Sequence, residues 1–194
     1  MSALLPQPNA GPPQHPAAMV RPLRQCVLRC DPYLRLVIGG TYGYTRGGGS
    51  QFHGGVDLYA EPGTPCYAMY RGAVEWAADF GADGWGRCVL TRLDFPTWTC
   101  WALYAHLSKV YRKAGPLEAG ATIGLTGISG NGDSRYPHLH FEIWRSLKAG
   151  AKGTRDKYRV DPLYVLGNLP FQRFATEVIE RRERERGTAR DRTA

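Results

Sequence analysis

The sequence predicts a mainly β fold, with one domain built on a single antiparallel β-sheet and a helix after it at the C-terminus. The 194 residues are enough for one domain with a sizeable core. The 24 glycines and 11 tyrosines favour turns and strands. Short apolar runs separated by turn residues recur along the chain, and helical spacing of apolar residues is clear only near the C-terminus.

A series of short strands is expected through the middle of the chain. The stretch 94–97 (DFPT) joins two of them and indicates a hairpin. Apolar segments at 26–30 and 34–38 precede the series, and residues 47–50 (GGGS) are expected to form a flexible loop. The expected strands cover residues 56–59, 66–70, 72–77, 88–93, 98–104, 122–126 and 138–144.

Four regions follow from these patterns. Residues 1–33 form a proline-rich arm and lead-in, because 1–18 contain five prolines and no Lys or Arg. Residues 34–166 form the β-rich domain. Residues 167–187 are predicted to be helical, since Phe171, Phe174 and Val178 follow helical spacing. Residues 188–194 are predicted to be a disordered tail.

Composition excludes two classes of protein. No run of about 18 apolar residues occurs, so no membrane-spanning helix is expected. The five cysteines include no C-x-x-C pair, which argues against a structural zinc site built on cysteine. Buried free thiols are the expected state of these side chains.

The net charge of +8 is unevenly distributed. Residues 144–159 carry six basic side chains against Asp156 alone, and the tail from residue 181 carries six arginines against three acids. This balance fits an anionic partner, such as nucleic acid, anionic lipid or another polymer, and equally fits a solvated basic surface. Aromatic residues do not alternate with the basic ones, which weakens the nucleic-acid interpretation.

Four of the five histidines lie in three short motifs: H-x-x-x-D at His53 and Asp57, Y-A-H-L around His106, and H-L-H at His138 and His140. Catalytic zinc takes three imidazole or carboxylate ligands and leaves a position for water. Two histidines two residues apart on a strand face the same side, so one can bind metal while the other acts on the water or the oxyanion. Taken singly, His106 also fits a packing residue and Asp57 a turn cap.

The residues around these motifs resemble one family, the lysostaphin/LytM-type zinc metallopeptidases of bacterial peptidoglycan. The resemblance covers residues 39–166, with the motifs in the family's order. It departs from the family in a longer loop at 130–136, with Tyr136 where glycine is common, and in the basic insertion between Glu142 and Val160. The matching stretches are 52–58 (FHGGVDL), 61–68 (EPGTPCYA), 103–108 (LYAHLS), 137–142 (PHLHFE) and 160–164 (VDPLY).

The resemblance implies an antiparallel β-sheet domain that hydrolyses peptide bonds in wall cross-links or stem peptides. It implies one zinc ion per chain. It also implies a set of metal ligands and a catalytic pair. A groove over the metal would bind the substrate, and the loop at 130–136 would form part of its wall. The implied ligands are His53, Asp57 and His140, the catalytic pair is His106 and His138, and the candidate substrate-binding residues are Tyr42, Tyr44 and Tyr136.

Two other functions stay open beside the zinc endopeptidase. The chain could be a non-catalytic module that regulates other wall hydrolases, or a wall-degrading component of a phage or injection particle. Expected partners are peptidoglycan and an immunity or carrier protein, with no nucleic acid and no membrane span. Because the N-terminus lacks a conventional signal peptide, we expect synthesis in the cytoplasm. We then expect unconventional delivery to the periplasm or wall, as for an antibacterial effector.

Overall fold

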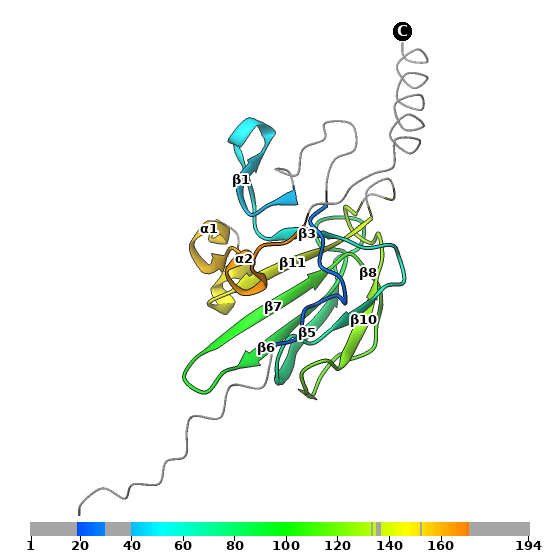
Figure 1. The fold of residues 1–194 in the computed structure, drawn as a ribbon. Coiled ribbons are helices and arrows are strands. Elements are labelled where there is room, and N and C mark those ends of the chain that lie inside the picture. The colour runs from blue at the N-terminus through cyan, green and yellow to red at the C-terminus, as the bar shows by residue number, and fades with distance from the viewer. Residues whose placement is uncertain (1–18, 30–39, 133, 135–136, 152, 171–194) are drawn as a thin grey trace, which may run out of the picture.

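The computed structural model describes residues 19–29, 40–132, 134, 137–151 and 153–170 (Figure 1). Strands dominate these ranges. The strands are β1 (Gly43–Arg46), β2 (Gln51–His53), β3 (Val56–Tyr59), β4 (Pro65–Tyr67), β5 (Gly72–Asp79), β6 (Arg87–Asp94), β7 (Thr99–Ala105), β8 (Leu107–Val110), β9 (Pro116–Leu117), β10 (Thr122–Thr126), β11 (His138–Trp144) and β12 (Arg159–Val160). The helical segments are η2 (Gly47–Gly49), η3 (Leu147–Gly150), α1 (Arg155–Tyr158) and α2 (Leu163–Leu166).

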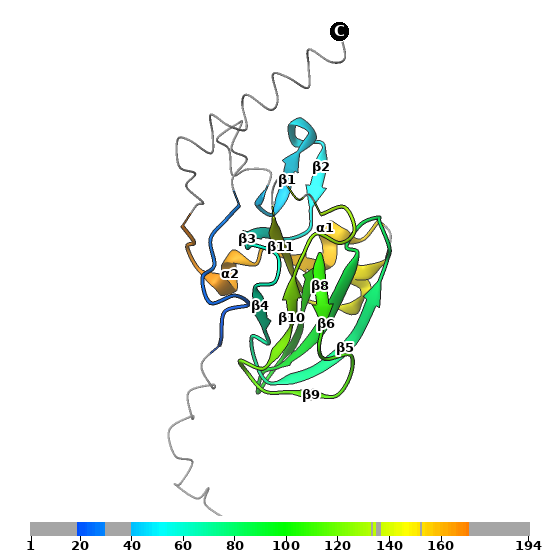
Figure 2. The same cartoon turned by 90° about the vertical axis from the view of Figure 1, so that its right-hand side faces the viewer.

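The strands confirm the predicted mainly β fold, and they are divided among three antiparallel sheets. The large sheet has the order β12-β11-β7-β6-β5-β9, with β3 also paired to β11. A three-stranded sheet, β4-β10-β8, lies alongside β6 and β5 (Figure 2). The β1–β2 hairpin stands apart from both (Figures 1 and 2). The hairpin expected around residues 94–97 is present, with Asp94 of β6 opposite Thr99 of β7.

Strand β11 is the element on which the functional motifs converge. On one edge it pairs with β7, and on the other it pairs first with β3 and then with β12. All of its side chains are buried. This register places His140 directly opposite Asp57 of β3 and, on the other side, opposite Ala105 of β7. Residues from three distant motifs therefore meet at one point of the sheet.

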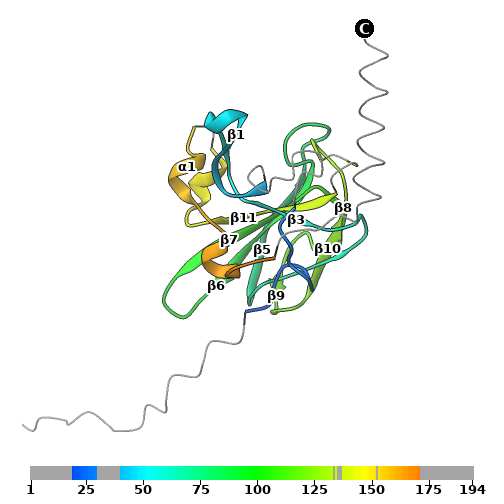
Figure 3. The same cartoon turned by 45° about the horizontal axis from the view of Figure 1, so that its top comes forward.

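The large sheet is covered on both faces because its strands alternate apolar residues between two cores. Val56, Leu58 and Phe141 belong to the larger core, which also contains residues of the three-stranded sheet such as Ile123. The opposite face packs Leu90, Leu103 and Trp144 against Ala149 of η3. The basic insertion thus covers part of the sheet, and Figure 3 shows α1 next to β1 near the end of β11.

The loop predicted at residues 47–50 forms the turn of the β1–β2 hairpin. Gly47, Gly48 and Gly49 have φ values of 57°, 65° and 93°. Glycine is the residue that adopts positive φ without steric cost, so the three glycines form a defined turn. The hydroxyl of Ser50 donates to the Gly47 carbonyl over 2.7 Å and closes the turn.

Several predictions fall on residues outside the described ranges. These are most of the proline-rich arm, the segment at 34–38, the predicted helix from residue 171 onward and the tail at 188–194. Residues 167–170, which the prediction placed at the start of that helix, contain no helical segment. The domain boundaries therefore stay a prediction. Among the described residues, every helix is too short to cross a bilayer.

The connection between β2 and β3 passes close to β11, and a substitution at Gly55 can test this close approach. A Cβ at Gly55 would lie 2.2 Å from the carbonyl oxygen of Phe141. We expect Gly55→Ala to lower the free energy of unfolding by about 1–3 kcal/mol, because β3 must move away from β11. Gly150→Ala is the matched control, since its Cβ would make only ordinary contacts with Trp144 at 3.5 Å. Equal urea midpoints for both variants would contradict the close approach.

Candidate active site

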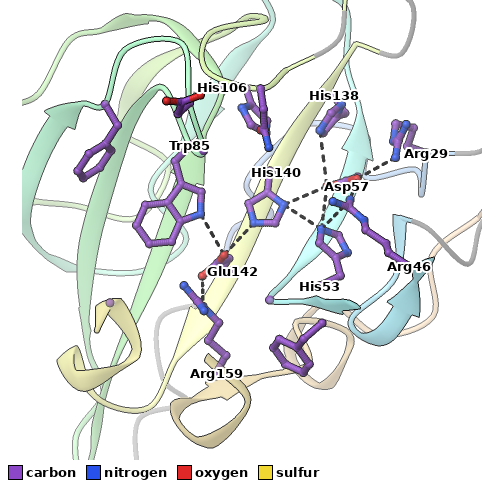
Figure 4. A pocket seen from close by; sticks show the side chains of 17 residues that line it. Arg29, Arg46, His53, Asp57, Trp85, His106, His138, His140, Glu142 and Arg159 are labelled. Carbon is purple, nitrogen blue, oxygen red and sulfur yellow. Dashed lines mark hydrogen bonds and ion pairs between the residues drawn. The ribbon is translucent and has the colours of Figure 1, made fainter. Parts of the chain in front are cut away.

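A pocket with a volume of about 610 Å³ opens on the face of β11 that carries His138, His140 and Glu142 (Figure 4). Its walls come from the β1–β2 hairpin, the loop between β5 and β6, the residue that follows β7, and the loop that precedes β11. The β5–β6 loop brings Phe80 and Trp85 to one wall. The sheet supplies the floor, so the side chains at the bottom are fixed by strand register.

Three polar side chains converge at the floor of this pocket. Asp57 Oδ1 lies 3.2 Å from His53 Nε2 and 3.0 Å from His140 Nδ1. The two histidine nitrogens are 3.0 Å apart. All three residues are buried, and Asp57 has no exposed surface. The structure thus brings together the three side chains that the resemblance implied as metal ligands.

The donor set fits a metal ion such as zinc. In a tetrahedral site with bonds of about 2.0–2.1 Å, ligand atoms lie about 3.3 Å apart, close to the three separations here. The outer nitrogens of both histidines are occupied: His53 Nδ1 lies 2.7 Å from the Thr41 carbonyl, and His140 Nε2 lies 2.8 Å from Glu142 Oε1. Because these partners are acceptors, a neutral ring carries its hydrogen on the outer nitrogen, so the rings that bind a metal would present the lone pairs of His53 Nε2 and His140 Nδ1 toward Asp57.

His106 and His138 lie beside the three converging groups. Their ring centroids are 5.0 Å apart, and the His106 ring is 5.9 Å from that of His140. His138 Nε2 is 3.6 Å from Asp57 Oδ1. His106 Nδ1 lies 2.9 Å from the Ser129 carbonyl, which leaves Nε2 of the neutral ring to face the pocket.

The backbone at His106 is unusual and places this side chain. Its φ of 61° is the one positive value among the non-glycine residues that the structure describes. The residue separates β7 from β8, and its backbone N–H donates to the Trp85 carbonyl over 3.0 Å. This turn carries the chain from the large sheet to the three-stranded sheet and directs the imidazole into the pocket.

The histidines differ in their affinity for protons. Burial, together with the neighbouring His140 and His138, lowers the pKa of His106 to about 3. Burial also lowers the pKa of His53. For His140, burial again favours the neutral ring, but hydrogen bonds to Asp57 and Glu142 outweigh it and raise the pKa to about 9. At neutral pH, His106 and His53 are thus ready to accept a hydrogen bond or a metal.

Comparison with known proteins agrees with this geometry. Residues 51–161, more than half of the chain, match the sequence profile of peptidase family M23. The chain belongs to peptidase family M23. The matched segment begins at β2 and ends just after β12, so it contains His53, Asp57, His106, His138 and His140.

Solved structures of M23 proteins resemble the chain over its central part. The catalytic domain of the antimicrobial peptidase lysostaphin from Staphylococcus simulans is 27% identical, with a TM-score of 0.51 over 66% of this chain and 90% of that one. LytU is 26% identical, with a TM-score of 0.52 over 67% and 83%. A catalytic-domain mutant of the prophage-encoded M23 protein EnpA from Enterococcus faecalis is 29% identical, with a TM-score of 0.48 over 63% and 85%.

Two of the three tyrosines expected to bind substrate, Tyr42 and Tyr44, lie near the pocket of this M23 chain but do not line it. Tyr42 packs edge-on against Phe52 and donates its hydroxyl to the Arg159 carbonyl over 2.9 Å. Tyr44 contacts the other edge of Phe52 and is 58% exposed. Phe52 itself lines the pocket, whereas neither tyrosine does. Tyr136 lies outside the described residues, so the predicted role of all three stays a prediction.

Sequence analysis missed two arginines at the M23 site. The guanidinium groups of Arg29 and Arg46 approach Asp57 Oδ2 over 3.0 Å and 2.6 Å, opposite the oxygen that faces the histidines (Figure 4). Burial alone would raise the pKa of Asp57, but the surrounding histidines hold it well below its usual range. Neither arginine lies in a motif. No pattern in the sequence pointed to them.

The raised pKa of His140 predicts a pH dependence for the metal-free protein. Its ordinary pKa is 6.5 and its folded value is about 9, so protonated His140 stabilises the fold. This contribution is fully present below about pH 6.5 and is lost as the pH rises through about 9. We expect the Tm of chelator-treated protein to fall between pH 7 and 9. The fall should be smaller in His140→Gln, and identical profiles would contradict the assignment.

Proposed function

We propose that this M23 chain is a zinc metalloendopeptidase that hydrolyses peptide bonds in bacterial peptidoglycan, within cross-links or stem peptides. The observation that carries the proposal is the convergence of His53 Nε2, Asp57 Oδ1 and His140 Nδ1 within about 3 Å of one another. His106 and His138 line the same pocket next to these groups. A site with three such donors and two further imidazoles contains the groups that metal-assisted hydrolysis of a peptide needs.

His53, Asp57 and His140 would hold the zinc. When bound, the ion would polarise the carbonyl of the scissile peptide and lower the pKa of a water molecule toward neutrality. Asp57 contributes one oxygen to this site, and Arg29 and Arg46 fix its other oxygen. The hydrogen bonds from His53 to Thr41 and from His140 to Glu142 orient both rings.

His106 and His138 would act on protons and on the oxyanion. The low pKa of His106 keeps its ring neutral, and its Nδ1 hydrogen is donated to Ser129. Its Nε2 can therefore accept a hydrogen bond from water in the pocket. His138, 5.0 Å away between ring centroids, can donate to an oxygen that gains negative charge. Together they supply the acid–base and electrostatic assistance that metal-assisted hydrolysis of a peptide requires.

A peptidoglycan substrate is supported by the likeness to the lysostaphin catalytic domain, which is an antimicrobial peptidase. The presence of all five side chains favours an enzyme over a non-catalytic module. A zymogram on purified wall tests the proposal. Clearing that is lost with a chelator and restored by zinc supports it, and binding without clearing would favour the module. Mass spectrometry of the released muropeptides would identify the bond that is cut.

Substitution of individual histidines separates the proposed roles. His140→Ala should lose zinc and activity together, because it removes one of the three ligands. His138→Ala and His106→Ala should keep about one zinc per chain, while the hydrolysis rate falls by roughly 10²–10⁴. Elemental analysis and a wall-clearing assay measure both quantities on the same samples.

His15→Ala is the control, since His15 is the one histidine outside the motifs. It should match the unmodified protein in zinc content and rate. Loss of zinc from His138→Ala equal to that from His140→Ala would show that the division of roles is wrong. An unmodified protein that takes up no zinc would contradict the proposed cofactor.

The basic insertion gives a separate prediction about wall binding. Arg145, Lys148 and Lys157 are exposed. Reversing all three charges to Glu should weaken binding to purified anionic wall at low salt and have little effect at high salt, because screening removes the attraction. The matched control reverses three exposed basic residues near the β8–β9 connection, Lys109, Arg112 and Lys113. Equal salt profiles for the two variants would show that the insertion is only a solvated surface.

A further inference from the structure

The carboxylate of Glu142 lies directly behind the proposed zinc ligand His140. It is 2% exposed, and four donors surround it. Oε1 accepts from His140 Nε2 over 2.8 Å and from Trp85 Nε1 over 3.3 Å. Oε2 accepts from Trp144 Nε1 and from Arg159 Nε. A carboxylate has about four lone-pair sites, so these donors fix its position and orientation.

Arg159 is the charged member of this group. It is 4% exposed, and its guanidinium carbon lies 5.4 Å from the Trp85 ring centroid and 5.3 Å from that of Trp144 (Figure 4). These separations are typical of cation–π contacts. The guanidinium therefore contacts two neighbouring indole rings, whose centroids are 5.7 Å apart, while its Nε–H donates to Glu142. Arg159 is the last residue of the basic insertion, so this segment extends into the site as well as over the surface.

Gly54 leaves space for the side chains of Arg159 and Glu142. A Cβ at Gly54 would lie 2.8 Å from Arg159 Cδ and 3.0 Å from Glu142 Oε1. The position after His53 thus requires glycine, because any side chain there would displace Arg159 or Glu142. The first glycine of the H-G-G-V-D motif is therefore the residue that the position of Arg159 requires.

We propose that Arg159 is a positioning residue: by holding Glu142, it fixes the ring orientation of His140 and the nitrogen that His140 presents to the metal. The inference rests on the proposed function, in which His140 is a zinc ligand. Glu142 as a carboxylate accepts hydrogen bonds and cannot donate. In the neutral ring that binds the ion, the hydrogen of His140 must then lie on Nε2, and Nδ1 keeps its lone pair for the ion.

Loss of Arg159 would release one side of this arrangement. Glu142 would keep its burial but lose its charged partner and one of the four donors. Its carboxylate would then rotate or draw in water, and the hydrogen bond to His140 would no longer have a fixed direction. Removing such an outer partner of a ligating histidine usually weakens metal binding.

The experiment compares Arg159→Met, Arg159→Lys and Arg145→Met with the unmodified full-length chain. Arg145 is the matched control, an exposed arginine of the same insertion whose guanidinium lies 6.0 Å from the Tyr158 ring. The zinc dissociation constant is measured by competition with a chromophoric chelator, and the visible absorption spectrum is recorded with cobalt in place of zinc. Both readouts are taken well below the unfolding temperature, so a role in global stability alone would leave them unchanged.

We expect Arg159→Met to raise the zinc dissociation constant by ~10–100-fold and to alter the cobalt spectrum. Arg159→Lys, which keeps the charge, should lie between Met and the unmodified chain, and Arg145→Met should match the latter. Folded Arg159→Met with unchanged zinc affinity and an unchanged cobalt spectrum would overturn the inference. If the Met variant does not fold, Arg159→Lys decides by the same criteria. Absence of zinc binding in the unmodified chain would instead overturn the proposed function.

Discussion

The site depends on the register between β3 and β11, which sets Asp57 directly opposite His140. A slip of one residue by either strand would turn its polar side chain into the apolar core and bring its core residues to the pocket floor. The register is held by Val56 and Phe141, which pack on the other face of the same strands. The residues that stabilise the fold therefore alternate with those that form the site, and neither set can shift without the other.

Asp57 shows how a buried charge is used here. A carboxylate without exposed surface carries a large desolvation cost unless partners compensate it. Its oxygens have different partners, with histidines at Oδ1 and the guanidinium groups of Arg29 and Arg46 at Oδ2. The histidines keep the group ionised, and the contacts of the two arginines restrain its rotation, so one oxygen stays directed at the histidines. The two guanidinium groups at Oδ2 thus hold the carboxylate in the position in which Oδ1 meets the histidines.

The strands and the pocket floor could be predicted because their signals are local. The alternation in residues 138–144 gives both the strand and its polar face, and the hairpin turn at 94–97 lies within one short stretch. Arg29, Arg46 and Arg159 escaped prediction because each reaches the site from a segment without a motif, and only tertiary packing brings them there. The loop at residues 47–50 could be predicted from its three consecutive glycines, but the turn that they form between β1 and β2 follows only from their φ values in the structure.

The positive φ of His106 has a consequence for evolution under selection for stability. A non-glycine residue in this conformation costs about 1 kcal/mol or more, whereas glycine or asparagine accepts it more easily. Selection for thermal resistance alone would therefore favour replacing a residue of the proposed catalytic pair. Selection for function must retain the imidazole although it costs conformational free energy. Catalysis and thermal stability therefore place opposite demands on position 106. Variants selected in the laboratory for heat tolerance alone would tend to be folded but inactive.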